Sequence, residues 1–326
     1  MTRRTVVTGA LLLLAPLSLL YALTAGSVPL SVGELLHALT ADTGTPTTVV
    51  LELRLPRALA GFAVGGMLAL SGALLQVLLR NPLADPYVLG ISGGASVATL
   101  LALLLGASGL YAGVAGFVGA SASMFLVFGL SHLGGPWTQT RLLLTGVVLA
   151  TGWGACVSLL LALTPSTQLH GVVFWLLGDL SAATHPGIGI VLLLTGLGIA
   201  LIYARPLNVL ARGETVAATL GEEPQRLRRV IYFLASFLTA VAVSLAGSIG
   251  FIGLIIPHAL RLLGGADHRY VLPNAVLLGG SFLVLADTFA RSAFAPVQLP
   301  AGVFTALIGV PVFLLILTRA TRTRPH

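Results

Sequence analysis

Long apolar runs separated by short polar segments dominate the chain. An α-helix needs roughly 20 apolar residues to cross a hydrocarbon core of about 30 Å. Runs near or above that length occupy residues 6–25, 58–79, 88–106, 110–133, 142–163, 188–204, 230–263, 271–290 and 303–317, and a shorter stretch occupies 172–177. This pattern predicts an all-α, polytopic membrane protein.

The run at residues 230–263 is too long for one span. As a single helix it would extend for about 51 Å at 1.5 Å per residue, so we divide it near residues 247–250, where glycines occur. The stretch at 172–177 is too short to cross. The sequence therefore predicts about ten transmembrane helices in a single domain over residues 1–326.

Arginine placement tests this topology. Cytoplasmic segments of membrane proteins carry an excess of basic residues. With ten spans and an inner N-terminus, all but three of the 17 basic residues fall on the inner side, and the exceptions are Arg54, Arg57 and Arg291. Both termini are then cytoplasmic. An alternative interpretation takes residues 1–25 as a signal peptide, although no small-residue cleavage site closes that apolar run.

Composition narrows the possible chemistry. An apolar content of 56% with 8% charged residues excludes a soluble protein. All 17 basic residues are arginine, so a P-loop lysine or a lysine Schiff base is excluded. The arginines flank apolar runs and form no patch with aromatic residues, which argues against nucleic acid. The single Cys156 and the spacing of the seven histidines indicate no metal site.

Few charges fall inside the apolar runs. Asp287 stands four residues before Arg291, a spacing that favours a helix-end ion pair over a proton relay. An ion-coupled carrier would need paired acids in the membrane, and only Asp287 and His258 approach that description. The polar segment at 205–229 predicts two short helices with stops at Gly213 and Gly221. Such helices dock a cytosolic partner or lie on anionic lipid, and spacing alone does not decide between these roles.

Four segments together resemble one protein family. Residues 53–95, with the motif RNPLADP, residues 205–221, residues 247–291, with LADTFAR, and residues 299–317 resemble the FecCD-type permeases. These are the membrane subunits of type II ABC importers for ferric siderophores, haem and cobalamin. The resemblance covers nearly the whole chain. It implies the ABC type II importer permease fold, with two inverted five-helix halves.

The resemblance also implies partners and a location. The permease is expected to be a homodimer in the bacterial inner membrane, in contact with the lipid bilayer. Two cytosolic ABC ATPase subunits would bind ATP and Mg, and a periplasmic or lipid-anchored binding protein would deliver substrate. This chain itself would carry no catalytic residue and no cofactor.

Particular residues take roles by resemblance. The expected ATPase-coupling residues are Leu210, Ala211, Gly213, Glu214 and Leu220. The expected docking residues for the binding protein are Arg54, Arg57 and Arg291, with lipid-headgroup binding as the alternative. The expected cytoplasmic gate comprises Asn81, Pro82, Leu83, Gln139 and Thr140.

The sequence does not identify the cargo. Iron chelates, either haem or a ferric siderophore, are the first expectation because they are the larger part of the family, and cobalamin is the alternative. Two other classes stay open: an ion-coupled secondary transporter, and a membrane scaffold without transport.

Overall fold

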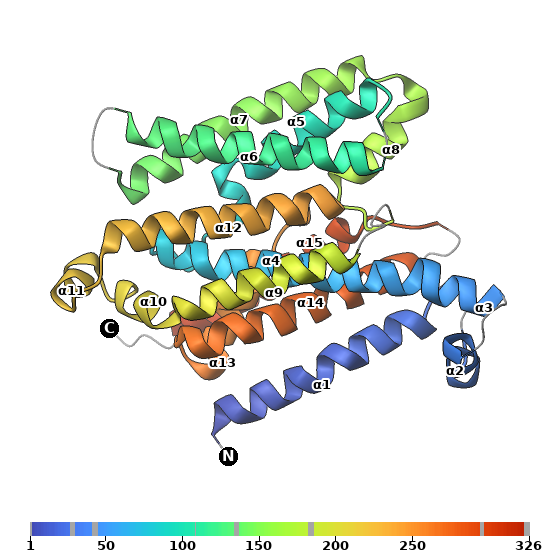
Figure 1. Cartoon of the computed structure of the whole chain (residues 1–326), viewed down its shortest axis with the longest axis horizontal. Coiled ribbons are helices and arrows are strands. Elements are labelled where there is room, and N and C mark those ends of the chain that lie inside the picture. Colours follow the sequence, from blue (N-terminus) through green and yellow to red (C-terminus); the bar gives the residue numbers. More distant parts are fainter. Residues whose placement is uncertain are drawn as a thin grey trace.

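The computed structural model describes residues 2–26, 30–40, 45–107, 109–133, 137–181, 186–293 and 297–322. Every regular element in these ranges is a helix, and the long helices run side by side along the molecule (Figure 1). The predicted all-α class is confirmed. Outer helices turn apolar side chains outward: Leu13 and Val148 are 66% and 70% exposed. Extended apolar surfaces of this kind suit a lipid surrounding.

Ten helices correspond to the ten predicted spans. They are α1 (Arg3–Thr24), α4 (Leu55–Leu78), α5 (Ile91–Leu104), α6 (Leu110–His132), α7 (Gln139–Leu163), α9 (Pro186–Ile202), α12 (Pro224–Ala246), α13 (Ile252–Gly264), α14 (His268–Ser292) and α15 (Ala301–Arg322). Among the described residues, six helices are long and apolar enough to cross a membrane. Helix α9 also qualifies when joined to α10, from which it bends by 57°. The remaining three are shorter apolar helices.

Shorter elements connect the spans. They are α2 (Val32–Thr40), α3 (Thr45–Thr48), the π-helix η1 (Val49–Arg54), the 3-10 helix η2 (Pro86–Leu89), α8 (Ser166–Leu176), α10 (Ala204–Leu210) and α11 (Glu214–Thr219). Helix α8 has 11 residues, so the stretch at 172–177 is too short to cross, as predicted. Helix α2 was not predicted. Its signal is a capping box, in which Glu34 accepts from the Ser31 amide at 2.7 Å and Ser31 Oγ accepts from the Glu34 amide at 3.2 Å.

The predicted division of residues 230–263 is confirmed. Helix α12 ends at Ala246, and α13 begins at Ile252. Gly247 has φ +68°, and a Cβ atom there would lie 2.0 Å from the carbonyl oxygen of Trp175. Only glycine fits that position, because the chain turns left-handed against the backbone of a neighbouring element.

Helix α4 forms the axis of the bundle. Of its most apolar stretch, 89% is buried, and it packs against α9, α12, α13 and α14. Close approach depends on glycine: a Cβ at Gly65 would lie 2.3 Å from the Gly279 oxygen, and one at Gly72 would lie 2.0 Å from the Gly253 oxygen. Membrane helices gain contact area through such small residues, because lipid supplies no hydrophobic force between helices.

The packing repeats between the two halves of the chain. Helix α4 packs against α13 and α14, and its counterpart α12 packs against α5 and α6. Each half also contains a short span that follows a left-handed residue, Gly90 before α5 and Phe251 before α13. This correspondence agrees with the predicted five-helix halves.

Helix α1 is an integral part of the bundle. It runs along α14 (Figure 1) and buries Leu11, Ala15, Ser18 and Ala22. This packing favours a transmembrane span over the alternative of a signal peptide for residues 1–25.

Candidate functional site

Helices α10 and α11 form a polar corner at the end of the bundle where α1 begins (Figure 1). We call this the inner end, because the basic segments of the topology prediction gather there. Gly213 and Gly221 bound α11 with φ +129° and +84°, conformations that favour glycine. The prediction of two short helices with stops at these glycines is confirmed.

The predicted coupling residues lie together in this corner. Leu210 ends α10 and is 2% exposed, whereas Leu220 follows α11 and is 64% exposed. Ala211 and Gly213 form the turn between the two helices. The corner therefore has a buried anchor on one side and an exposed apolar side chain on the other.

Asn208 fixes α10 to the start of α14. Its Nδ2 donates to Asp267 Oδ1 at 2.9 Å, and its Oδ1 accepts from the His268 amide at 2.8 Å. The hydrogen bond from Asn208 lowers the pKa of the Asp267 carboxyl. Asp267 also caps α14 by accepting from the Arg269 amide at 3.0 Å.

Glu214 joins the corner to two other elements. Its carboxylate lies 3.2 Å from Nη1 of Arg228, which belongs to α12. It also lies 3.6 Å from Nη2 of Arg80, a residue just beyond the end of α4. The Arg228 side chain is 5% exposed, and its guanidinium lies 4.6 Å from the ring centre of Trp137. Arg80 has φ +46°, an uncommon conformation for a residue with a Cβ atom. The sequence did not indicate that Glu214 would lie between these two arginines.

The predicted gate residues Asn81, Pro82 and Leu83 form an exposed loop that begins at Arg80. Asn81 shapes this loop: its Oδ1 accepts from the Leu83 amide at 2.9 Å, and its carbonyl accepts from the Ala84 amide at 3.1 Å. Leu83 is 42% exposed. The structure thus places the predicted gate next to the predicted coupling residue Glu214.

Asp85 ties the same loop to the break between α12 and α13. It accepts from the Tyr87 amide at 2.8 Å and caps η2, and the Tyr87 hydroxyl accepts from the Ile249 amide at 2.9 Å. Burial raises the pKa of the Asp85 carboxyl to about 6. A buried carboxyl with a raised pKa therefore sits at the base of the predicted gate.

The other two predicted gate residues, Gln139 and Thr140, open helix α7. Thr138 caps that helix by accepting from the Arg141 amide at 3.2 Å. In the described part of the chain, no hydrogen bond or ion pair joins Gln139 or Thr140 to the loop at 81–83, so their gate role stays a prediction.

The opposite end of the bundle holds the three arginines that the topology prediction left outside. Arg57 binds Asp287 through two hydrogen bonds, Nε to Oδ2 at 2.9 Å and Nη2 to Oδ1 at 2.8 Å. The two side chains are 15% and 5% exposed. Asp179 lies 3.9 Å from the same Arg57 nitrogen, Nη2. A bidentate pair of this kind fixes the geometry of both side chains.

Arg54 and Arg291 complete this outer cluster by binding the last carbonyls of α1. Arg54 Nη1 donates to Leu23 and Thr24 at 2.7 and 3.1 Å, and Arg291 Nη2 donates to Ala22 at 2.5 Å. Cations at a helix C-terminus are favourable, because the final carbonyls lack partners within the helix. The cluster thus joins α1, α4 and α14 at the outer end.

The predicted ion pair between Asp287 and Arg291 is present, at 3.9 Å. The closer partner of Asp287 is Arg57, which lies 230 residues away in the chain, so local spacing gave no signal for it. Because Asp287 is held by two arginines, the structure favours an ion pair over a proton relay at this position.

The helical bundle, with polar segments at its two ends, defines a multi-pass membrane protein of the transport permease class. Residues 12–319 match the sequence model of the FecCD transport family, and the chain belongs to this family.

Individual relatives agree with that assignment. The chain is 41% identical over 299 residues to the cobalamin import system permease protein BtuC of Halobacterium salinarum, covering 90% of this chain and 80% of the relative. It is 42% identical over 284 residues to the uncharacterized ABC transporter permease protein YvrB of Bacillus subtilis, covering 85% and 80%.

A solved structure shares the fold. The chain superposes with a TM-score of 0.84 and 32% identity on an inward-facing conformation of a metal-chelate type ABC transporter, covering 97% of this chain and 99% of that one. The predicted ABC type II importer permease fold is confirmed. The protein is a transport subunit of an ABC importer.

Proposed function

We propose that this chain is the permease of an importer for cobalamin or a related metal chelate. It works as a homodimer in the bacterial inner membrane, with both termini cytoplasmic. Two ABC ATPase subunits drive it from the inner side, and a binding protein delivers cargo from the outer side. The observation that carries the proposal is the position of Glu214, which connects the corner formed by α10 and α11 to the loop at 81–83.

The proposed mechanism is alternating access. ATP-driven movement of the ATPase pair would displace α11, whose neighbour Leu220 offers an exposed apolar contact. Glu214 would transmit that movement to Arg80, and so to the loop at 81–83. The ion pairs supply a direct physical connection between the two elements, as a coupled pathway requires. ATP and Mg belong to the partner, so this chain would act as the conduit.

The outer cluster is the proposed docking site for the binding protein. Three arginines face two acids there, Asp179 and Asp287, which leaves one net positive charge among these five side chains. Acidic residues of a partner would approach the small exposed parts of Arg57 and Arg291, 15% and 12% of these side chains, while Asp287 holds the arginines in place. Charge complementarity of this type steers and orients association.

Cobalamin takes precedence over iron chelates as the proposed cargo. The relative from Halobacterium salinarum is a cobalamin import permease, and the superposed structure is of the metal-chelate type. The first expectation from the sequence, haem or a ferric siderophore, has no relative of that kind among those described above and stays a prediction.

Uptake by proteoliposomes tests the function. Vesicles holding the permease and its partner ATPase, supplied with the binding protein, are expected to accumulate cobalamin only when ATP is present on the ATPase side. Accumulation of haem or a ferric siderophore in place of cobalamin would overturn the cargo assignment. Uptake driven by a proton gradient without the ATPase would overturn the mechanism.

The same vesicles test docking. The double variant Arg57→Gln with Asp287→Asn removes both members of the bidentate pair, so neither faces the other's missing charge, and Arg291 loses its acid at 3.9 Å but keeps its hydrogen bond to the Ala22 carbonyl. Weaker affinity of the binding protein for this variant supports docking at the cluster. Unchanged affinity at physiological salt would assign the cluster to structure or to lipid headgroups.

A further inference from the structure

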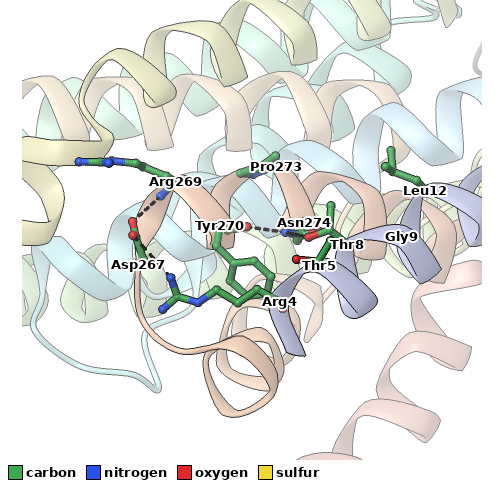
Figure 2. A pocket seen from close by; sticks show the side chains of 10 residues that line it. All are labelled: Arg4, Thr5, Thr8, Gly9, Leu12, Asp267, Arg269, Tyr270, Pro273 and Asn274. Carbon is green, nitrogen blue, oxygen red and sulfur yellow. Dashed lines mark hydrogen bonds and ion pairs between the residues drawn. The ribbon is translucent and has the colours of Figure 1, made fainter. Parts of the chain in front are cut away.

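The cavity between α1 and α14 lies at the inner end and has a volume of about 490 Å³. Figure 2 shows its polar part, where Arg4 lies beside Asp267 and Asn274 beside Thr8 while the Arg269 side chain points away on the far side of Asp267, and its apolar part, which extends to Leu12. We propose that this cavity binds an anionic phospholipid, with the phosphate at the polar part and an acyl chain along α1.

Two buried polar atoms beside the cavity lack partners within the described part of the chain. Asn274 is 1% exposed, and its Nδ2 donates to Thr8 Oγ1 at 3.1 Å and to the Tyr270 carbonyl at 2.7 Å. Its Oδ1 and the Tyr270 hydroxyl have no hydrogen-bond partner among the residues that the structure describes. Leaving such groups unpaired costs roughly 1–3 kcal/mol each. Both atoms are closed to solvent in this structure, so a ligand with both a donor and an acceptor would satisfy them once the side chains that cover them shift.

The charges at the polar part favour an anion. Arg4 donates through Nε to the Gly264 carbonyl at 2.6 Å and lies 3.8 Å from Asp267, yet its side chain stays 50% exposed. Arg269 is exposed on the other side of Asp267. Two arginines against one aspartate leave a net positive charge. Basic pockets between membrane helices on the cytoplasmic side suit anionic headgroups.

The chemistry of a phosphatidylglycerol headgroup fits these features. Its phosphate oxygens accept from the arginines and from the Tyr270 hydroxyl. Its glycerol hydroxyls donate to Asn274 Oδ1. Free phosphate would meet the first requirement but has no apolar part to place beside Leu12.

The acyl chain has a path along α1. Leu12, Leu13 and Leu17 are exposed by 57%, 66% and 58%, and they follow the cavity toward the middle of the span. Only 28% of the apolar stretch of α1 is buried. The polar part of the cavity lies at the inner end and the apolar part lies further toward the middle of the membrane. A phospholipid in the inner leaflet places its headgroup and its acyl chain in this same order.

Native mass spectrometry of the full-length permease in detergent tests the proposal, with added phosphatidylglycerol or phosphatidylcholine. Phosphatidylglycerol is expected to bind more tightly than phosphatidylcholine. The double variant Arg4→Gln with Arg269→Gln should bind phosphatidylglycerol about thirtyfold more weakly, from roughly fivefold for each arginine near the membrane surface. Arg226→Gln, an exposed basic position at the start of α12, is the control and should bind like the unmodified protein.

Two further arms distinguish the alternatives. Asn274→Leu, which keeps the side-chain size but removes the unpaired oxygen, should weaken phosphatidylglycerol binding while leaving phosphatidylcholine binding unchanged. Competition by inorganic phosphate at equal strength would assign the site to a free anion. Equal binding of the two lipids, or equal loss in the Arg226 control, would overturn the proposal. Elution as a folded species is required of every variant, and the Asn274 and arginine variants provide independent readouts.

Discussion

Replacing Glu214 by glutamine removes one charge at the inner corner while keeping the side-chain size. Glu214 lies between two arginines, Arg228 at 3.2 Å and Arg80 at 3.6 Å. Nε and Nη2 of Arg228 are buried without hydrogen-bond partners in the described structure. Neutralising Glu214 therefore leaves two arginines that repel one another.

The free energy that is lost in this variant follows from how far each ion pair is exposed to solvent. The side chains of Arg80 and Glu214 are 38% and 40% exposed, so their pair contributes only about 0.5 kcal/mol. The bond to Arg228 changes from charged to neutral, which costs about 1–1.5 kcal/mol. The total of about 2 kcal/mol corresponds to a roughly thirtyfold shift of a local opening equilibrium.

Hydrogen exchange measures this shift. Amides of α11 and of the loop at 80–85 should exchange about thirtyfold faster in Glu214→Gln than in the unmodified permease, because local opening controls their exchange. Glu223→Gln is the matched control, an exposed acid in the same corner that forms no ion pair among the described residues. If both variants exchange alike, Glu214 does not hold the corner to the loop, and the coupling mechanism is wrong.

Two further predictions concern the axis and the gate. Gly72→Ala places a Cβ atom 2.0 Å from the Gly253 oxygen, so α4 and α13 must separate, which lowers the free energy of unfolding by about 1–3 kcal/mol or more. Thermal unfolding in detergent measures this loss of stability. The control is Gly152→Ala, where no atom lies within 4 Å of the added Cβ, and its stability should not change. Asp85 has its pKa raised from 3.8 to about 6, so the folded state binds more protons than the unfolded state between these values, and the free energy of unfolding should fall as pH rises from about 4 to 6. Asp85→Asn should lack this fall, and an identical pH profile of the melting temperature in the two proteins would refute the assignment.

Local patterns in the sequence predicted the helices and their ends well. Run length and the glycines at 247–250 placed the break between α12 and α13, and Gly213 and Gly221 placed the ends of α11. These features depend on backbone conformation and on the length of a membrane span, which short segments of sequence encode. The capping box of α2 is equally local, because Ser31 and Glu34 alone encode it.

The polar contacts required tertiary structure. The spacing of Asp287 and Arg291 predicted their ion pair but not the bidentate bond to Arg57, because nothing local connects residues so distant in the chain. The same limit applies to Glu214 and Arg80. The sequence assigned both residues to the inner side, and only the fold brings them to 3.6 Å.

Helix α4 connects the two charged ends of the permease. Arg57 lies in its first turn and Arg80 follows its last turn, and a helix of 24 residues spans about 36 Å. Glycines at 65 and 72 press its backbone against α14 and α13, which leaves little space for bending within the bundle. If Glu214 displaces Arg80 as proposed, we expect α4 to move as a rigid body, together with the Arg57–Asp287 pair at its far end. The inner corner and the outer cluster would then move together, because α4 carries Arg57 of the outer cluster and leads directly to Arg80 of the inner corner.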